Sequence, residues 1–441
     1  MLLPLPMLQY IGEESVFALK SYEMFLSGNY LQTSLYGGIM KDPPFYHWLV
    51  IGIVQVIGWD YLEVAIRLVS VLASWLSALM LGVFAAHLWR DRQVGWLAAA
   101  VYLCLAEVMF WYGWLGYVDM SFACCLLAAN LALWRAVEAR DSRWYFVACL
   151  LLAGSVMVKN LTAYPLFAAT ALVLVWRMQA WHFLYKPLVI LGSLLALCLP
   201  VVWGHAVNSG GEAVQTQVMW AEIMRKFSGV DLLAYAQHLI EMPLQLFLRC
   251  APFSLLLLFL WWQAKQRWAW DAHLSTLAWI ALLSFMPFWL APGGSPRYFL
   301  PVYPWLALII TYLLWQLQAK HLKLAVQCMV IVLVLKVPYS LWGLPYLKDG
   351  MIERDLKVVA QDIIEKTEGW PICSVNVAST GLSVAAYINV MRDNGDYIRY
   401  CTGSRAFMIS YHLQDKLGSP EHSYRIRGDA LYLYRIEGDQ H

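Results

Sequence analysis

Long apolar segments recur along most of this chain, and they constrain its fold more than any other feature. A helix needs roughly 20 apolar residues to cross the hydrocarbon core of a bilayer. Ten segments from Leu62 onward approach or reach this length. They cover residues 62–88, 94–115, 120–134, 144–158, 161–176, 187–203, 243–262, 274–291, 298–317 and 322–343. Since 61% of the residues are hydrophobic and only 14% charged, the composition argues against a soluble protein and predicts an all-α polytopic membrane domain.

The segments before residue 62 are shorter and more polar. Residues 1–11 are apolar but too short to span, so we interpret them as a fragment of a helix that starts upstream or enters the bilayer incompletely. Residues 15–27 favour an amphipathic helix on the membrane surface, and residues 43–58 an interfacial or re-entrant helix. The prediction is about 11 transmembrane helices, with interfacial helices in the first outer loop.

The composition changes after the last apolar segment. Residues 346–441 have the usage of a soluble domain. Helices are predicted at 352–365 and 382–391, and strands at 372–377, 397–401, 407–411 and 430–436. The sequence therefore predicts two domains, a transmembrane domain at 1–345 and a small α/β domain at 346–441.

Basic residues in the connections indicate the orientation. One alternate set of short connections carries Arg90, Arg92, Arg135, Arg140, Arg143, Arg177, Lys186, Lys265, Arg267 and Lys320. Connections rich in Lys and Arg face the cytoplasm. The first loop and the C-terminal domain are then expected on the opposite, periplasmic side of a bacterial inner membrane. In that oxidising compartment Cys373 and Cys401 are able to pair, the alternative being two free thiols within strands. A net charge of +2 gives no basic surface for nucleic acid.

The polar loop before the spans contains candidate acid and base groups. Glu13 and Glu14 are adjacent carboxylates, and a carboxylate at a membrane interface suits a general base. Asp119 begins an apolar helix on the same face. The alternatives are that the two glutamates are solvated loop charges or a helix cap, and that Asp119 is only a cap and dipole partner.

Several cations lie close to or within apolar segments, namely Lys41, Lys159, Arg249 and Arg297. Such placement is costly unless the cation meets an anion or a water-filled cavity, and a phosphate is one candidate anion. Snorkelling, pairing with a structural carboxylate, or a plain loop position are the alternatives. Residues 204–242, with a helical stretch at 214–227, form a long outer loop that suits a lid.

Five motifs in this order resemble the GT-C glycosyltransferases, most closely the aminoarabinose transferase and protein O-mannosyltransferase group. They are Glu13-Glu14, Lys41-Asp42-Pro43-Pro44 with Tyr46 and Trp48, Asp119-Met120, Lys159-Asn160, and Pro296-Arg297-Tyr298-Phe299-Leu300-Pro301. The resemblance covers roughly residues 1–343. It implies inverting transfer of a sugar from a polyprenyl-phosphate carrier, such as undecaprenyl phosphate, to an envelope acceptor (lipid A, protein or glycan) at the periplasmic face.

The resemblance, together with the placement of the charged residues, gives a set of expected residue roles. The expected catalytic residues are Glu13, Asp119 and Glu14, with Glu13 as the base and Asp119 as its partner in one cavity. The expected substrate-binding residues are Lys41, Asp42, Tyr46, Trp48, Lys159, Arg225, Arg249, Arg297 and Tyr298, and at least two of Lys41, Arg249 and Arg297 are expected to converge on the carrier phosphate. No cofactor is required, although a divalent metal is compatible.

Two positions depart from the family pattern. Glu13 stands where the family usually has Asp, and Asp42 separates Lys41 from the prolines, so that either Lys41 or Asp42 occupies the place of the family's lysine. Two other classes of function remain open. They are a lipid or sugar transporter or flippase, and a non-enzymatic assembly factor for an envelope polysaccharide.

Overall fold

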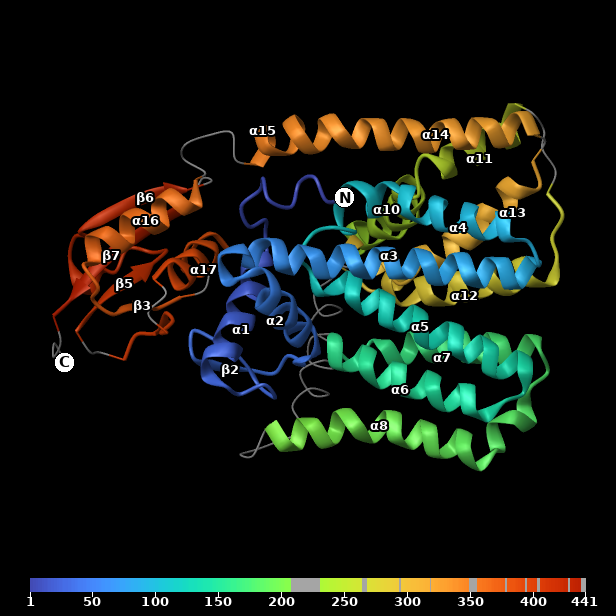
Figure 1. Ribbon diagram of the computed structural model, residues 1–441, viewed down its shortest axis with the longest axis horizontal. Helices are drawn as coiled ribbons and strands as arrows, with labels where there is room; N and C mark the ends of the chain where they lie inside the picture. Colours follow the sequence, from blue (N-terminus) through green and yellow to red (C-terminus); the bar gives the residue numbers. More distant parts are fainter. Residues whose placement is uncertain are drawn as a thin grey trace. The chain divides into compact units, whose positions relative to one another are not determined.

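Figure 1 presents a computed structural model of the chain, which consists of two compact units. The structure describes residues 1–207, 231–263, 268–292, 295–317, 319–348, 355–376, 379–392, 395–402, 405–426 and 429–437. The first unit comprises residues 1–69, 115–117 and 337–441. The second unit comprises residues 70–114 and 118–336.

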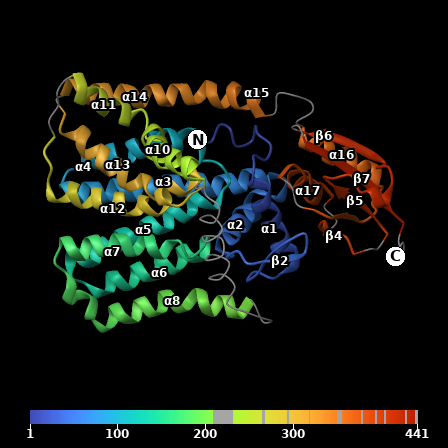
Figure 2. The same cartoon turned by 180° about the vertical axis from the view of Figure 1, so that it is seen from behind.

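The second unit is helical. Its long elements are α3 (Leu62–Trp89, which starts in the first unit), α4 (Arg92–Cys104), α5 (Val118–Ala139), α6 (Ser142–Val158), α7 (Ala163–Arg177), α8 (Pro187–Val207), α10 (Leu232–Arg249), α11 (Phe253–Gln263), α12 (Ala272–Leu290), α13 (Tyr303–Trp315) and α14 (Ala319–Pro338). Helices α5, α6 and α8 lie side by side in Figure 1 and again from behind in Figure 2, and α7 packs on both α5 and α12. Short helical turns η2 (Glu107–Trp111), η3 (Trp181–Tyr185) and η4 (Pro296–Phe299) connect these helices.

Aspartates begin many of these helices. The carboxylate of Asp91 accepts a hydrogen bond from the Gln93 N–H at 2.8 Å at the start of α4. The same cap occurs at Asp141, Asp231, Asp271 and Asp355. Because the first N–H groups of a helix have no partner within it, a capping Asp stabilises each start by about 1 kcal/mol.

Within the described residues, five helices are long and apolar enough to cross a membrane, and six if the bent pair α10 and α11 counts as one span. Four further apolar helices are shorter: α2 (Phe45–Ile57), α6, α7 and α13. A polytopic helical membrane protein is therefore confirmed. The count of about 11 spans stays a prediction.

Two of the predicted spans are not single straight helices. The segment predicted at 243–262 is two helices that meet at an angle of 98° around residues 250–252. The segment predicted at 94–115 ends as an α-helix at Cys104 and continues as the π-helical turn η2. The Ala106 N–H donates to the Ala251 carbonyl at 2.9 Å, so the two breaks are bonded to each other. Hydropathy alone does not register such breaks, because their residues are as apolar as the helices around them.

The first unit begins with residues 1–11, which form turns and not the predicted helix fragment. Helix α1 (Glu14–Ser27) follows, close to the predicted bounds. Its polar side chains Lys20 and Glu23 are buried, so they do not form the solvated face of an amphipathic helix. The expectation that this helix lies on the membrane surface stays a prediction. A two-stranded hairpin, β1 (Thr33–Leu35) and β2 (Gly38–Met40), then leads into α2 and the turn η1 (Trp59–Tyr61).

The C-terminal part of the first unit is a small α/β domain, as predicted. It contains α16 (Leu356–Thr367), β3 (Ile372–Ser374), α17 (Ser379–Arg392), β4 (Arg399–Tyr400), β5 (Ala406–Ser410), η7 (Asp415–Leu417), β6 (His422–Ile426) and β7 (Asp429–Ile436). The turn η5 (Tyr339–Gly343) and α15 (Leu344–Lys348) precede it. The sheet has the order β4-β3-β5-β7-β6, with β3 parallel to both its neighbours and the other pairs antiparallel. Strand β6 was missed because its edge position leaves it largely polar and half-exposed.

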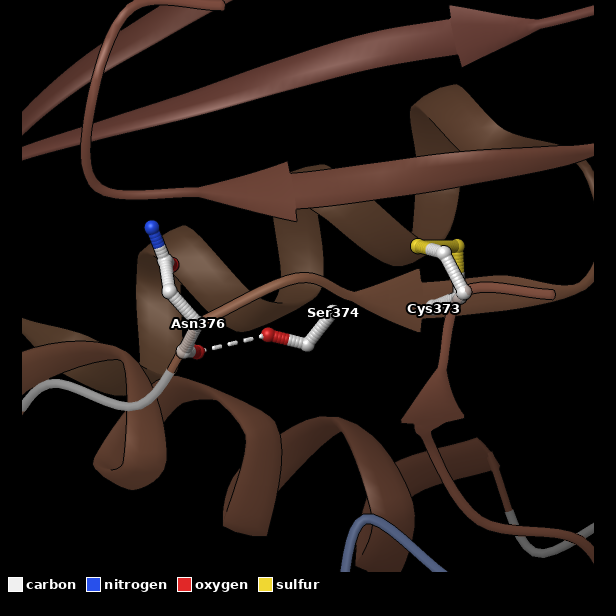
Figure 3. Close-up of a disulfide and its surroundings, with 4 residues drawn as sticks. Cys373, Ser374 and Asn376 are labelled. Atoms are coloured by element: carbon white, nitrogen blue, oxygen red, sulfur yellow. Dashed lines mark hydrogen bonds between the residues drawn. A yellow bond between two sulfur atoms is a disulfide. The ribbon is translucent and has the colours of Figure 1, made fainter. Parts of the chain in front are cut away.

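Cys373 and Cys401 form the predicted disulfide (Figure 3), with their Cα atoms 4.9 Å apart. Cys373 lies in β3, and Cys401 directly follows β4. Close by, the Ser374 hydroxyl donates to the Asn376 carbonyl at 2.9 Å. The disulfide therefore joins the edge strand to the interior of the sheet.

Candidate active site

Glu14 is the most tightly bound of the predicted site residues. Its Oε1 accepts from Arg67 Nε at 2.9 Å and from the Gly116 N–H at 2.7 Å. Its Oε2 accepts from an Arg67 terminal nitrogen at 2.6 Å and from the Ile11 N–H at 2.8 Å. Both side chains of the ion pair are 0% exposed. A carboxylate that is enclosed and bound by four donors is an anchor, so the geometry favours a structural role for Glu14 over the predicted catalytic one.

Arg67 also binds the N-terminal turns. Its remaining N–H groups donate to the carbonyls of Leu5, Leu8 and Gln9 at 2.9, 2.6 and 2.8 Å. These bonds wrap residues 1–11 around one guanidinium and explain why this segment is not a helix. Sequence reasoning gave Arg67 no role. The feature that could have indicated its role is its position inside an apolar segment, where an arginine requires an anion or a set of carbonyls nearby.

Glu13 differs from its neighbour because its side chain is exposed. The backbone is nevertheless fixed, since the Glu13 N–H donates to the Tyr117 hydroxyl at 3.1 Å and that hydroxyl donates to the Ile11 carbonyl at 3.3 Å. Gly12 allows this approach with φ +58, because a Cβ there would lie 2.4 Å from the Tyr117 hydroxyl. The arrangement presents an accessible carboxylate on a held backbone, as a general base requires.

The Lys41-Asp42 segment is held by an ion pair between Asp42 and Lys20 of α1. The Lys20 side chain is 6% exposed and that of Asp42 50%. The Thr33 hydroxyl donates to the Asp42 carbonyl at 3.0 Å. Lys41 is exposed. Asp42 therefore neutralises the buried Lys20. In the Lys41-Asp42 segment, the positive charge at the surface belongs to Lys41.

The two aromatic residues after the prolines have different surroundings. Tyr46 is buried, and its hydroxyl donates to the Gly116 carbonyl at 3.2 Å. Trp48 is 39% exposed, and its indole N–H donates to the Tyr30 carbonyl at 2.6 Å. Tyr46 thus supports the same Gly116 whose N–H binds Glu14, whereas Trp48 retains an accessible ring.

Four predicted residues come together in the second unit, and we call them the Tyr298 cluster: Asp119, Lys159, Arg297 and Tyr298. Asp119, in the first turn of α5, pairs with Lys159 at the end of α6. The Lys159 ammonium lies 4.6 Å from the centroid of the Tyr298 ring, and the Arg297 guanidinium 5.4 Å from it. Two cations therefore lie near one aromatic ring, and one of them is paired with a carboxylate.

A second ion pair joins Arg249, at the end of α10, to Glu107 in the π-helical turn η2. Glu107 Oε1 is buried without a hydrogen-bond partner among the described residues. The hydroxyl of Tyr112 is near enough to Glu107, Arg297 and Asp119 to interact electrostatically with all three. Glu107 escaped the sequence reasoning, although a carboxylate inside an apolar run is itself a signal.

The other predicted site residues are divided between the two units or lie outside the described residues. Arg225 and the helical stretch predicted at 214–227 lie outside the described residues. Glu13 and Lys41 belong to the first unit, whereas Asp119, Arg249 and Arg297 belong to the second. Convergence of Glu13 with Asp119, and of Lys41 with the two arginines, stays a prediction.

A metal site and a ligand cavity are two further features that could mark a functional site among the described residues. Among the described residues, no group of three or more His, Cys, Asp or Glu side chains is arranged to hold a metal ion. A cavity of about 280 Å³ lies in the first unit and contains none of the predicted site residues. Its lining consists of Tyr22, Phe25, Leu26, Trp59, Asp60, Val390 and Gly395.

Known proteins resemble this chain in both sequence and fold. Residues 41–204 match the family described as dolichyl-phosphate-mannose-protein mannosyltransferase. An undecaprenyl phosphate-alpha-4-amino-4-deoxy-L-arabinose arabinosyl transferase of Pseudomonas aeruginosa (strain LESB58) is 28% identical over 319 residues, which cover 70% of this chain and 56% of that protein. The chain thus spans about half the length of the curated relatives it matches.

Two solved structures share the fold. ArnT from Cupriavidus metallidurans in the apo state aligns with a TM-score of 0.70 at 15% identity, over 100% of this chain and 97% of that one. The same protein bound to undecaprenyl phosphate aligns with a TM-score of 0.68 at 16% identity, over 99% of this chain and 96% of that one. The family match, the relatives and the shared fold together make this chain similar to the GT-C superfamily of polyprenyl-phosphate-sugar glycosyltransferases.

Proposed function

We propose that the chain is an inverting glycosyltransferase that moves a sugar from a polyprenyl-phosphate carrier to an acceptor of the cell envelope. The observation that carries the proposal is the Tyr298 cluster, in which Lys159 pairs with Asp119 and the Lys159 and Arg297 cations both lie near one aromatic ring in a unit of apolar helices, an arrangement that suits an anionic ligand. The name of the Pseudomonas relative supports undecaprenyl phosphate as the carrier and 4-amino-4-deoxy-L-arabinose as the first sugar to test. Lipid A, a protein or a glycan is the acceptor.

The reaction in this proposal is a single displacement. An acceptor hydroxyl attacks the anomeric carbon, the bond from that carbon to the phosphate oxygen breaks, and the phosphate leaves with the electron pair. Glu13 takes the proton of the hydroxyl, as its exposed carboxylate on a held backbone supports. Lys159, Arg297 and Arg249, together with Lys41, stabilise the charge that grows on the phosphate.

The two other carboxylates have supporting roles. Asp119 pairs with Lys159 and so fixes the direction of that ammonium. Glu14 anchors the loop that carries Glu13, because its ion pair with Arg67 is enclosed. Tyr46 supports the same anchor, and Tyr298 and Trp48 offer aromatic surface to the sugar or the carrier.

The orientation that we propose places the first loop and the C-terminal domain in the periplasm of a bacterium. The disulfide between Cys373 and Cys401 supports this side, because disulfides persist in oxidising compartments. The basic connections on the opposite side support it independently. We further propose about 11 spans and a domain boundary near residues 345 and 346.

The test is a reconstitution of the purified chain in lipid nanodiscs with undecaprenyl-phosphate-linked aminoarabinose and lipid A. Release of undecaprenyl phosphate together with a matching mass increase on lipid A is the expected result. Parallel arms replace lipid A by envelope protein and by glycan. Movement of the intact donor between leaflets, with no release of the carrier in any arm, would indicate a flippase instead.

A further inference from the structure

A buried carboxylate shapes the hairpin that leads into the Lys41-Asp42 segment. Glu23 of α1 accepts from the Tyr36 N–H and the Ser34 hydroxyl at 2.7 Å each, and from the Gly37 N–H at 3.1 Å. Tyr36 and Gly37 form the two-residue turn between β1 and β2, with φ 53 and 73. Glu23 therefore fixes the closed end of the hairpin to the first helix.

The same turn meets strand β4 of the C-terminal domain, within the first unit. The Tyr400 N–H donates to the Tyr36 carbonyl at 3.0 Å, and the two tyrosine rings pack edge to face with their centroids 5.6 Å apart. A Cβ at Gly38 would lie 3.1 Å from the Tyr400 ring, so the approach is close. The turn is thus held on one side by Glu23 and on the other by β4.

Strand β4 is itself weakly supported by the sheet. It has two residues and one neighbouring strand, β3. The Cys401 N–H donates to the Ser374 carbonyl at 3.1 Å, and the disulfide links Cys401 to Cys373 in β3. A short edge strand opens easily, and the disulfide restrains it covalently.

The open end of the hairpin runs directly into Lys41 and Asp42. Thr33 at the start of β1 holds the Asp42 carbonyl, and Lys20 holds the Asp42 carboxylate. The hairpin's three pairs of residues connect the Tyr36-Gly37 turn to Met40, which directly precedes Lys41.

We propose that strand β4 positions the Lys41-Asp42 segment for the phosphate of the donor, with Tyr400 on Tyr36 as the contact and the Cys373–Cys401 disulfide as the anchor. The inference rests on the proposed function, in which Lys41 binds that phosphate. Tyr400, Cys373 and Cys401 are positioning residues, since they act through the hairpin.

Other contacts keep the domain docked when β4 is loosened. The Ser383 hydroxyl donates to the Ser15 hydroxyl at 3.1 Å, Lys357 pairs with Glu63 at 2.7 Å, and Gln9 donates to Asp355 at 2.8 Å. A change at β4 therefore perturbs the hairpin without releasing α16 and α17 from the outer loop.

The experiment compares the full chain with three variants in nanodiscs. Cys373→Ser with Cys401→Ser removes the anchor, Tyr400→Ala removes the ring contact but keeps the disulfide, and Tyr400→Phe keeps the ring. The control is Tyr424→Phe. Tyr424 lies in β6, the opposite edge strand of the same sheet, and the change removes its 2.7 Å hydrogen bond to Asp362. Two quantities are measured, namely hydrogen exchange of residues 33–44 and the KM and kcat for the lipid-phosphate donor.

The expected result is faster exchange of residues 33–44 in the disulfide variant and in Tyr400→Ala, with a donor KM about tenfold higher and a kcat within about twofold of the parent. Tyr400→Phe and Tyr424→Phe should match the parent. Unchanged exchange, or a KM no higher than in the control, overturns the positioning role even where the enzyme is active. Absence of transfer by the parent chain overturns the proposed function. The inference then fails as well, whatever the exchange data show.

Discussion

Glu14 and Arg67 form an ion pair in which every oxygen of the carboxylate is bound and neither side chain reaches solvent. Fifty-three positions of sequence separate the two residues, yet they join the first loop to the first long helix. Adjacent Glu13 is exposed, and its backbone N–H donates to the Tyr117 hydroxyl. The two neighbouring glutamates therefore have different surroundings.

Removing Glu14 should destabilise the protein. Glu14→Ala leaves Arg67 buried without its counter-ion, which typically costs about 3 to 5 kcal/mol. Thermal unfolding in detergent, followed by intrinsic fluorescence, measures the loss. Glu365→Ala, an exposed carboxylate on α16, is the control and should change stability by less than about 0.5 kcal/mol. Equal Tm values for the two variants would refute the anchor.

Glu13→Gln should instead lower turnover. Loss of a general base costs about 100-fold to 10,000-fold in rate, while the exposed position of Glu13 leaves the Tm near that of the parent. Transfer assays at saturating donor measure kcat. Near-normal turnover of Glu13→Gln beside an inactive Asp119→Asn would show that the base has been assigned to the wrong carboxylate.

Lys159→Met should weaken donor binding. A hydrogen bond to a charged group contributes about 1.5 to 3 kcal/mol, so the Kd for undecaprenyl phosphate should rise by about 10-fold to 150-fold. Lys323→Met, an exposed lysine at the start of α14, serves as the matched control. Native mass spectrometry in nanodiscs gives both constants, and indistinguishable values would remove the Tyr298 cluster from the phosphate site.

His47 predicts a pH dependence of stability. Helix α2 has 13 residues and is too short to span. Burial within the first unit, and after it the nearby charge of Lys20, lower the pKa of His47 to about 3. Asp42 and a hydrogen bond involving Phe17 oppose this shift, and Ser21 lies 2.8 Å from its Nδ1. Because the unfolded chain takes up the proton near pH 6.5, the stabilising contribution is complete above that pH and falls toward pH 3.

The expected loss is about 1.4 kcal/mol per pH unit below 6.5, until other groups titrate. Tm values at pH 7 and 5.5 measure it. His47→Gln should flatten this slope, whereas His412→Gln, an exposed histidine of the C-terminal domain, should keep it. A slope that is the same in both variants would mean that His47 is not the group responsible.

The sequence by itself determined the features that depend on local pattern. Apolar runs predicted a helical membrane protein because a bilayer requires about 20 apolar residues in a row. Alternation and helical periodicity predicted α16, α17 and most strands of the C-terminal domain, and the two cysteines outside the apolar runs predicted the disulfide. The motif order predicted the GT-C superfamily.

Only the tertiary structure decided which charges meet. Glu13 and Glu14 are the same residue type at adjacent positions, and the enclosure of one follows from Arg67 and from the Gly116 N–H, 102 residues away. The partners of Asp119 and Arg249 lie 40 and 142 positions away. Periodicity within a helix carries no information about such pairs, because a buried charge is stabilised by whichever opposite charge the packing of distant helices brings to it.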